Sequence, residues 1–330
     1  MTGHPRQAPS DANAQQIRAR VLRALADNRT PGLHFVGHFI GTRWDEITPL
    51  RAHLSVDVGP HCADAGGEAN LNVVTTLIDM ALANAIRAGL SMGHGTRLGT
   101  ISMHIAFTGE PLTGRLDAQA HCEGWVRDTS PAQGVARCNL TADGRLACIA
   151  SGTFMELPPP PGVVLAPLPW QPGGVPPGLQ LEVRDLDARE RAVWRRAQAA
   201  LAGATPDSTF FQQLFAQFPV ARALPQGRAQ LTMPMALHAG NRVGHAQGGV
   251  SFAFAALAAA AAAPASQRLV EASGWFLSPG EGRQLKALAK VSRSGRRLSV
   301  VDTVITGSGG TRVLEMVSTH CALAAGRTRS

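Results

Sequence analysis

Two stretches of the chain repeat one pattern of turn and helix, and they differ in the residues that could do chemistry. A shift of 177 residues along the sequence pairs Asp64 with Asn241, Gly67 with Gly244, Asn70 with Gln247, and Asp79 with Ala256. The first copy therefore holds a carboxylate inside an apolar helix, and the second begins its helix with Gly248 and Gly249. A carboxylate can act as a general base or a nucleophile. The free N–H groups at a helix start can receive a developing negative charge. The repeat suggests one active site shared between the two halves.

Asp79 and the two glycines also have a purely structural interpretation. The Asp79 side chain could bond to Thr75 or Thr76, one helical turn earlier. The glycines could simply let the helix pack closely against a neighbour. Catalysis is favoured for Asp79, because burying an acid among apolar residues is costly unless it has a partner or a purpose.

The polar residues before the second helix have the same two interpretations. Asn241 is of a type that is common in turns, and the Gln247 amide could cap the helix. His245, two residues before Gln247, is a weaker candidate for a base. All three remain candidates for the site.

The charge of the chain points to an anionic partner. The net charge is +8 and the pI is about 10.4. The densest basic cluster contains Arg293, Arg296 and Arg297. It is either a solvated strand edge or a seat for the phosphates of a nucleotide-tailed substrate. Nucleic acid is not expected, because the chain has no tyrosine, only five tryptophans and no recognition motif.

The hydrophobic periodicity predicts helices that alternate with runs of antiparallel strands, an α+β fold. The predicted helices cover residues 11–27, 73–88 (with Asn72 as N-cap and Gly89 as terminator), 185–201, 209–218 and 249–263. The predicted strands cover 33–40, 50–58, 99–107, 115–126, 134–141, 145–154, 228–235, 269–277, 283–293, 297–306 and 311–322. The helix 249–263 is apolar on every side, which is typical of a helix wrapped by a sheet.

These elements divide the chain into four parts. We expect a tail and helix over residues 1–31, a first domain over 32–157, a proline-rich linker and helix over 158–206, and a second domain over 207–330.

The same sequence predicts a cytoplasmic location. The five cysteines are unclustered, which favours reduced thiols over disulfides or a zinc site. There is no signal peptide, and the longest apolar run ends at Pro264, short of a membrane span.

The segment Asn241-Arg-Val-Gly244-His-Ala-Gln247-Gly248-Gly249 resembles a known signature. It is similar to the Asn-x-x-Gly-x-x-His-Gly-Gly pattern of hotdog-fold acyl-CoA thioesterases of the phenylacetate-degradation type. The family has an acid nine residues after its His, and Asp79 holds that position in the first half. The resemblance covers residues 32–157 and 207–325, which implies a tandem, double-hotdog chain. The chain departs from the signature at Gln247, which replaces the His, and at Asn70-Leu71-Asn72, which replace His-Gly-Gly.

The resemblance implies an acyl-CoA thioesterase with one composite site in an internal pseudo-dimer. Asp79 would act as base or nucleophile opposite an oxyanion hole at Gly248 and Gly249, and the reciprocal site would lack the acid. Asn241 and Gln247 would hold the thioester or the water, and the expected substrate-binding residues are Thr76, His245, Arg293 and Arg296.

The resemblance further implies that no metal and no cofactor is needed beyond the CoA of the substrate. We expect a homo-oligomer with no nucleic-acid or membrane partner. A non-catalytic acyl-CoA-binding protein and a hotdog hydratase or dehydratase remain as alternatives.

Overall fold

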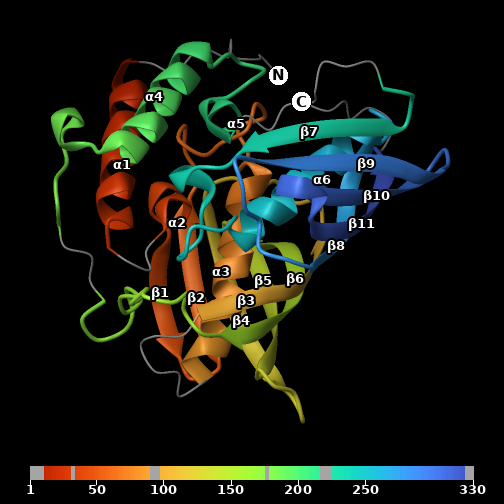
Figure 1. The fold of residues 1–330 in the computed structure, drawn as a ribbon. Coiled ribbons are helices and arrows are strands. Elements are labelled where there is room, and N and C mark those ends of the chain that lie inside the picture. The colour runs from red at the N-terminus through yellow and green to blue at the C-terminus, as the bar shows by residue number, and fades with distance from the viewer. Residues whose placement is uncertain (1–10, 31–33, 90–96, 175–177, 216–223, 324–330) are drawn as a thin grey trace.

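The strands of the described residues join one antiparallel sheet, which Figure 1 shows wrapping around two central helices. The computed structural model describes residues 11–30, 34–89, 97–174, 178–215 and 224–323. The strand order is β1-β2-β4-β5-β6-β3-β8-β11-β10-β9-β7. The strands of the first half are β1 (Arg43–Thr48), β2 (Arg51–Asp57), β3 (Arg97–Phe107), β4 (Arg115–Val126), β5 (Gln133–Ala142) and β6 (Arg145–Leu157). Those of the second half are β7 (Arg228–Pro234), β8 (Gln267–Phe276), β9 (Gln284–Ser294), β10 (Leu298–Thr306) and β11 (Arg312–Ala322).

The two halves have the same architecture. The order β2-β4-β5-β6-β3 of the first half corresponds to β7-β9-β10-β11-β8 of the second, and β1 is an additional edge strand. The helix α3 (Leu71–Gly89) lies against the first set of strands, and α6 (Gly248–Ala262) lies against the second. The halves meet where β3 pairs with β8, so that Ser102 lies opposite Trp275 and Ala106 opposite Glu271. The predicted α+β fold with an internal pseudo-dimer is confirmed.

The turn before each central helix is repeated bond for bond. The Asp64 side chain accepts hydrogen bonds from the N–H groups of Gly66 and Glu68, and Asn241 accepts the corresponding bonds from Val243 and His245. Gly67 and Gly244 both have positive φ, +81° and +87°, which glycine adopts without strain. The internal repeat found in the sequence is therefore a repeat of structure.

Each central helix begins with a side-chain cap. The Asn70 side chain accepts a hydrogen bond from the Asn72 N–H at 3.0 Å, and the Gln247 side chain accepts one from the Val250 N–H at 2.8 Å. Both bonds satisfy N–H groups that the helix itself leaves free. The predicted N-cap at Asn72 is wrong, because α3 starts at Leu71 and the cap falls on Asn70. The helix α6 is almost entirely buried and ends just before Pro264.

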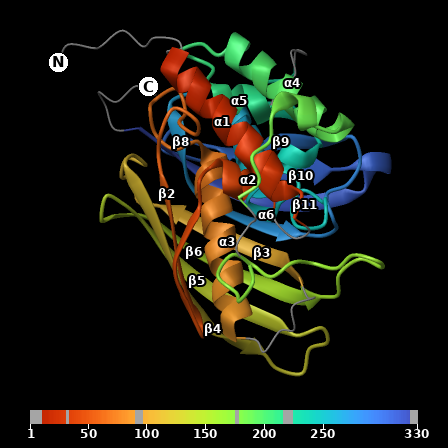
Figure 2. The ribbon, with the colours of Figure 1, turned by 90° about the vertical axis from the view of Figure 1, so that its left-hand side faces the viewer.

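Four further helices form a layer beside the sheet, as Figure 2 shows. The buried Phe39 ring contacts those of Phe210 and Phe211, and the Arg29 guanidinium bonds to Glu190 at 2.7 Å. These contacts join the N-terminal segment to the chain between the halves. The helices are α1 (Asp11–Asn28), α2 (Phe35–Phe39), α4 (Ala188–Gly203) and α5 (Phe210–Phe215), and three short 3-10 turns are η1 (Val183–Asp185), η2 (Leu237–Ala239) and η3 (Ser308–Gly310).

The predicted strand over residues 33–40 is wrong, because its described part forms the helix α2. The His34 side chain caps this helix by accepting the Gly37 N–H, and Phe35 stacks on Phe39 one turn later. The three apolar residues of this short segment, Phe35, Val36 and Phe39, do not distinguish a buried strand from a buried helical turn. Strand β1 is absent from the prediction. Residues 216–218 of the predicted helix over 209–218 lie outside the described residues.

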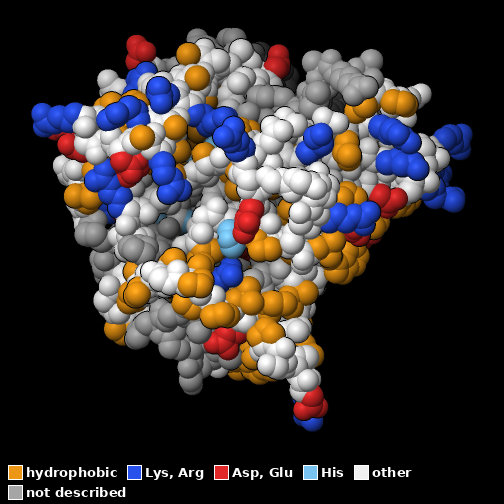
Figure 3. All heavy atoms as spheres, viewed as in Figure 1, with side chains coloured by type: hydrophobic (Ala, Val, Ile, Leu, Met, Phe, Trp, Pro, Cys, Tyr) orange, Lys and Arg blue, Asp and Glu red, His pale blue; other side chains and the backbone are white. Residues whose placement is uncertain are grey.

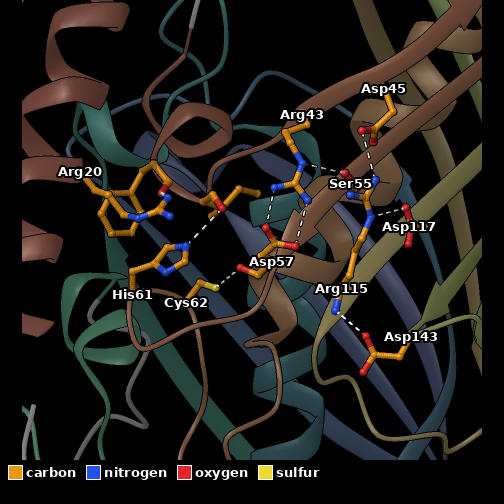
Figure 4. A network of polar contacts seen from close by, with 12 residues as sticks. Arg20, Arg43, Asp45, Ser55, Asp57, His61, Cys62, Arg115, Asp117 and Asp143 are labelled. Atoms are coloured by element: carbon orange, nitrogen blue, oxygen red, sulfur yellow. Dashed lines mark hydrogen bonds and ion pairs between the residues drawn. The ribbon is translucent and has the colours of Figure 1, made fainter.

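A network of ion pairs ties β1, β2 and β4 together on the surface of the first half (Figure 4). Arg43 pairs with Asp57, and Arg115 pairs with Asp45 and Asp117 at 3.1 and 2.9 Å. None of the described helices combines the length and the apolarity that a membrane span requires. All five cysteines are free thiols.

Candidate active site

A cavity of about 290 Å³ opens between the two halves of the pseudo-dimer. One face of α3 lines it, together with the turn before α6, the start of β3 and part of the proline-rich linker. Figure 3 shows this side of the molecule hollowed near its middle, with a histidine and a basic side chain visible between hydrophobic ones. The lining residues from α3 are Asp79, Met80, Ala83, Asn84 and Arg87, and those from the turn and helix of the second half are Asn241, Arg242, His245, Ala246, Gln247, Gly248 and Ser251.

Asp79 lies at the junction of the two halves. Its Oδ2 accepts a hydrogen bond from the Gln247 Nε2 at 2.7 Å, and its Oδ1 accepts one from the Thr100 hydroxyl at 2.9 Å. The side chain is buried, with 7% of the residue exposed, and it faces the cavity. The alternative in which Asp79 bonds to its own threonines is wrong. The Thr75 hydroxyl donates to backbone carbonyls instead, one of them Gly249 O at 2.7 Å.

Burial raises the pKa of Asp79 from 3.8 to about 6. Hydrogen bonds from Thr100, the Gly249 N–H and Gln247 favour the charged form and offset part of this rise. A carboxylate with this pKa is ionised at neutral pH and still basic enough to take a proton from water.

The raised pKa gives a testable effect on stability. The folded state binds the Asp79 proton more tightly than the unfolded state, so Asp79 favours folding below about pH 4 and loses this contribution as the pH rises through 6. We expect Asp79→Asn to be more stable than the wild type at pH 8, by up to about 3 kcal/mol, and to show little gain at pH 4. Urea unfolding at the two pH values measures this difference. An equal change in the free energy of unfolding at pH 4 and at pH 8 would contradict this prediction.

The two glycines at the start of α6 differ in their surroundings. A Cβ on Gly248 would lie 2.7 Å from an Asp79 oxygen and 2.8 Å from the Thr100 hydroxyl, and Gly248 lines the cavity. A Cβ on Gly249 would lie 2.5 Å from the backbone of Thr75, so Gly249 allows α6 to touch α3. Because the Gly249 N–H favours the charged form of Asp79, the first N–H of the helix, at Gly248, is the candidate left for an oxyanion donor.

Of the other predicted site residues, Asn241, Gln247 and His245 line the cavity. Gln247 both caps α6 and bonds to Asp79, and Asn241 holds the turn. His245 contacts Glu281 at 3.0 Å, and burial lowers the pKa of its imidazole while Glu281 opposes the change. Thr76 does not line the cavity, but its hydroxyl lies 3.5 Å from the Gln247 Oε1.

The structure does not bring Arg293 and Arg296 to the cavity. They lie at the exposed outer end of β9 and its turn to β10, where Figure 3 shows basic side chains gathered. The arginines that do line the cavity are Arg87, Arg97 and Arg242, and the sequence prediction missed all three. Helical spacing carried a signal for Arg87, which follows Asp79 by eight residues on the same face of α3.

The reciprocal position of the pseudo-dimer has no acid. Ala256, which corresponds to Asp79, is fully buried, and the Asn70 side chain is engaged by Asn72. This arrangement agrees with a single composite site.

A second group of polar side chains lies away from the cavity. Asp45, His53 and Asp117 have the spacing of metal ligands and form the only such group that the described residues contain. The Arg115 guanidinium already binds both carboxylates, as Figure 4 shows, so a cation occupies the centre of this group. We assign it to the stability of the sheet edge.

Comparison with known proteins supports the fold and part of the function. A family profile described as "Acyl-CoA thioesterase N-terminal domain" matches residues 237–321, which contain the turn, α6 and β8 to β11. No curated protein matches the sequence.

Several solved structures resemble most of the chain. One is from Lactobacillus plantarum, described as a candidate oleoyl thioesterase: TM-score 0.52, 12% identity, covering 83% of this chain and 97% of that one. A 12:0-ACP thioesterase from Umbellularia californica has a TM-score of 0.50 at 11% identity and covers 83% and 95%. An Alicyclobacillus acidocaldarius protein of unknown function, described as having a hotdog fold, has a TM-score of 0.50 at 10% identity and covers 86% and 96%.

These likenesses confirm that the chain has the hotdog fold. The second half is similar to an acyl-CoA thioesterase domain, so the family resemblance holds at this coarser level. The narrower resemblance, to the phenylacetate-degradation type, stays a prediction.

Proposed function

We propose that the protein hydrolyses an acyl-CoA thioester in the cavity between its two halves, with Asp79 as the general base. The observation that carries this proposal is the position of Asp79, a buried carboxylate that faces the first turn of α6 across the pseudo-dimer junction. The match of the second half to an acyl-CoA thioesterase domain supports the choice of substrate.

In this mechanism Asp79 takes a proton from a water molecule while the water oxygen attacks the thioester carbonyl carbon. The carbonyl oxygen becomes an oxyanion, which accepts a hydrogen bond from the Gly248 N–H at the positive end of the α6 dipole. The C–S bond then breaks, the CoA sulfur receives the proton, and a carboxylic acid is released. Gln247 and Thr100 orient the carboxylate through the two bonds to its oxygens.

Direct attack by an Asp79 oxygen on the carbonyl carbon is the other route open to the same residue. It would expel the thiolate and leave an anhydride, which water would then hydrolyse. A single turnover in ¹⁸O-labelled water separates the two routes, because only the second can leave label in the Asp79 carboxylate.

The chemistry needs no metal ion and no redox cofactor. We extend the proposal to a cytoplasmic homo-oligomer of double-hotdog chains, in keeping with five free thiols and no zinc-like spacing.

The test is a thiol-release assay with short, long and aromatic acyl-CoAs, together with calorimetric binding of the same esters. Release of CoA thiol supports the proposal. Binding without release would favour a non-catalytic acyl-CoA-binding protein, and addition of water to an enoyl-CoA would favour a hydratase.

The pH dependence gives a further prediction. Since only ionised Asp79 acts as a base, kcat/KM is expected to rise with pH through about 6 and to level off above it. Removing the hydroxyl in Thr100→Val removes a bond that favours the charged form, so the midpoint moves to higher pH and the rate at pH 6 falls. Thr100→Ser keeps the bond and serves as the control. A profile that is the same in Thr100→Val and wild type would contradict this role for Thr100.

A further inference from the structure

Two histidines of the helical layer reach the cavity beside α3. His34 caps the short helix α2, His38 lies within it, and both line the cavity. The position that a Cβ on Gly37 would take lies 2.7 Å from His34 Cε1 and 3.2 Å from Met80 Cε. His34 therefore packs beside Met80, the residue that follows Asp79 on α3 and also lines the cavity. A thioester held at Asp79 thus has the two imidazoles within reach of one of its ends.

That end is the acyl group, because the imidazoles lie in a buried part of the lining. The turn before α6 is more open: the His245 side chain is 21% exposed, and Glu281, which it contacts, is 63% exposed. The His38 side chain is 10% exposed, and Asp27 beside it only 5%. A cavity of about 290 Å³ is at the small end of what a drug-sized ligand fills, so the larger CoA nucleotide stays outside, on the open side.

The hydrogen bonding of His34 leaves it with a donor. Its Nδ1 accepts the Gly37 N–H at 3.2 Å, so the proton of the neutral imidazole lies on Nε2. Burial lowers the pKa of His34 to about 3, and the neighbouring His38 and Arg242 act in the same direction, so the ring is neutral at pH 7. Within the described residues the His34 Nε2–H has no hydrogen-bond partner. It is available to an oxygen in the cavity.

The contact of His38 with Asp27 leaves His38 with an acceptor. Asp27 is buried, and its Oδ2 lies 3.3 Å from the His38 Nδ1. Burial by itself would raise the pKa of Asp27, but the contact with His38 and the charge of Arg23 outweigh it and lower this pKa, so the carboxylate is charged. A charged Asp27 holds a proton on Nδ1, which leaves the lone pair of the neutral imidazole on Nε2. In the part of the chain that the structure describes, nothing bonds to this Nε2.

The donor and the acceptor lie side by side in apolar surroundings. The ring centroids of His34 and His38 are 6.5 Å apart, and their planes meet at 67°. Two hydrogen bonds to one oxygen span up to about 6 Å between the nitrogens, so a single oxygen between the rings can reach both. Trp44 packs against His38 with ring centroids 5.9 Å apart, and Met80 and Ala83 add apolar lining. An unpaired polar group in such a place is costly, which favours a ligand that satisfies both imidazoles.

We infer that the acyl group of the substrate carries a hydroxyl, which accepts a hydrogen bond from the His34 Nε2–H and donates one to the His38 Nε2. This inference rests on the proposed function and specifies its substrate as a hydroxyacyl-CoA. A hydroxyl is both donor and acceptor, whereas a keto oxygen only accepts and would leave the His38 lone pair unpaired. A carboxylate fits less well, because Asp27 places a negative charge next to His38.

The test compares hexanoyl-CoA with its 3-hydroxy, 5-hydroxy, 3-oxo and 5-oxo derivatives at pH 8. We expect the wild type to prefer one of the hydroxy esters to hexanoyl-CoA in kcat/KM by roughly tenfold to a hundredfold, the range of two hydrogen bonds between neutral groups. The corresponding oxo ester is expected to fall between the two, because it can bond to His34 alone.

Asparagine variants remove each Nε2 and keep the contact that Nδ1 makes. In His34→Asn the amide oxygen can still accept the Gly37 N–H, and asparagine is a good N-cap. In His38→Asn the amide N–H can still bond to Asp27. Each is expected to bring the ratio of hydroxy ester to hexanoyl-CoA close to one, and His38→Gln, whose amide oxygen replaces the acceptor, to restore part of it. His121→Asn, exposed on β4 and outside the cavity, is the matched control and is expected to keep the wild-type ratio.

Binding of the same esters to Asp79→Asn, measured by calorimetry, separates this inference from the proposed function. A preference for a hydroxy ester in binding supports the inference even if the wild type releases no thiol. Hydrolysis without any preference for a hydroxy ester, in binding or in turnover, would overturn it and leave the hydrolase intact. An oxo ester as good as its hydroxy counterpart would also overturn it, because the acceptor at His38 would then have no role. Loss of turnover with every ester in a folded His38→Asn would overturn it too and assign His38 to proton transfer.

Discussion

Asp79→Asn is expected to lower kcat/KM for acyl-CoA hydrolysis by at least about a hundredfold, within the 10²–10⁴ range of general-base catalysis. The amide has the shape of the carboxylate and can still bond to Gln247 and Thr100, but it cannot take a proton from water. The variant is therefore expected to fold and to bind the ester. The measurement is thiol release at pH 8, where the wild-type carboxylate is ionised.

The internal repeat supplies the matched control for this variant. Asp64 is the acid of the first turn, and its side chain accepts N–H groups of its own turn as Asn241 does in the second. Asp64→Asn places the residue of the second turn in the first, so we expect nearly wild-type activity. Undiminished turnover in Asp79→Asn would show that the base lies elsewhere.

Gly249→Ala is expected to cost the largest share of stability among single substitutions at the site, about 3 kcal/mol. The new Cβ would lie 2.5 Å from the carbonyl oxygen of Thr75 and from the N and Cα of Thr76. These are backbone atoms, so relief requires α3 and α6 to separate. That movement would also draw the Gly249 N–H away from Asp79. Chemical denaturation gives the loss in the free energy of unfolding.

Two other alanine substitutions test the reason for this loss. A Cβ on Gly248 meets the ends of the Asp79 and Thr100 side chains. Gly248→Ala is therefore expected to lower kcat/KM strongly and to lower the free energy of unfolding less than Gly249→Ala does. A Cβ on Gly178 meets nothing within 4 Å, and Gly178→Ala is expected to change neither. If Gly249→Ala is as stable as Gly178→Ala, the contact between the two helices is not tight.

Local patterns accounted for most elements of the fold. Strand β4 was predicted with its observed bounds, and α6 within a residue at each end, because alternation and helical periodicity are properties of short windows. The helix α2 was missed because it is five residues long, too short for a period to show. Its form depends on the His34 cap and on the phenylalanines it packs against.

The features of the site also divide into those that the sequence predicted and those that it did not. The resemblance to double-hotdog thioesterases implied that Asp79 would lie opposite the start of α6, and the hydrogen bond from Gln247, 168 residues away in sequence, places the two side by side. No short sequence pattern predicted the hydrogen bond from Thr100 to the Asp79 carboxylate, because that bond depends on how β3 crosses α3. The basic cluster at Arg293 and Arg296 was conspicuous in the sequence but lies away from the cavity.

The sequence by itself determined the repeat, the two central helices and the single acid, since each is written in residue type and spacing. Only the tertiary structure decided the chemistry around that acid. Burial between the two halves sets the pKa of Asp79, and the approach of α6 to α3 places an N–H group beside it. The tertiary structure also decided which arginines line the cavity. An arginine side chain is long, and the direction in which it extends depends on the packing around it rather than on its neighbours in sequence. The dense basic cluster of the sequence predicted where an anion would bind, but packing placed Arg87, Arg97 and Arg242 along the cavity instead of Arg293 and Arg296.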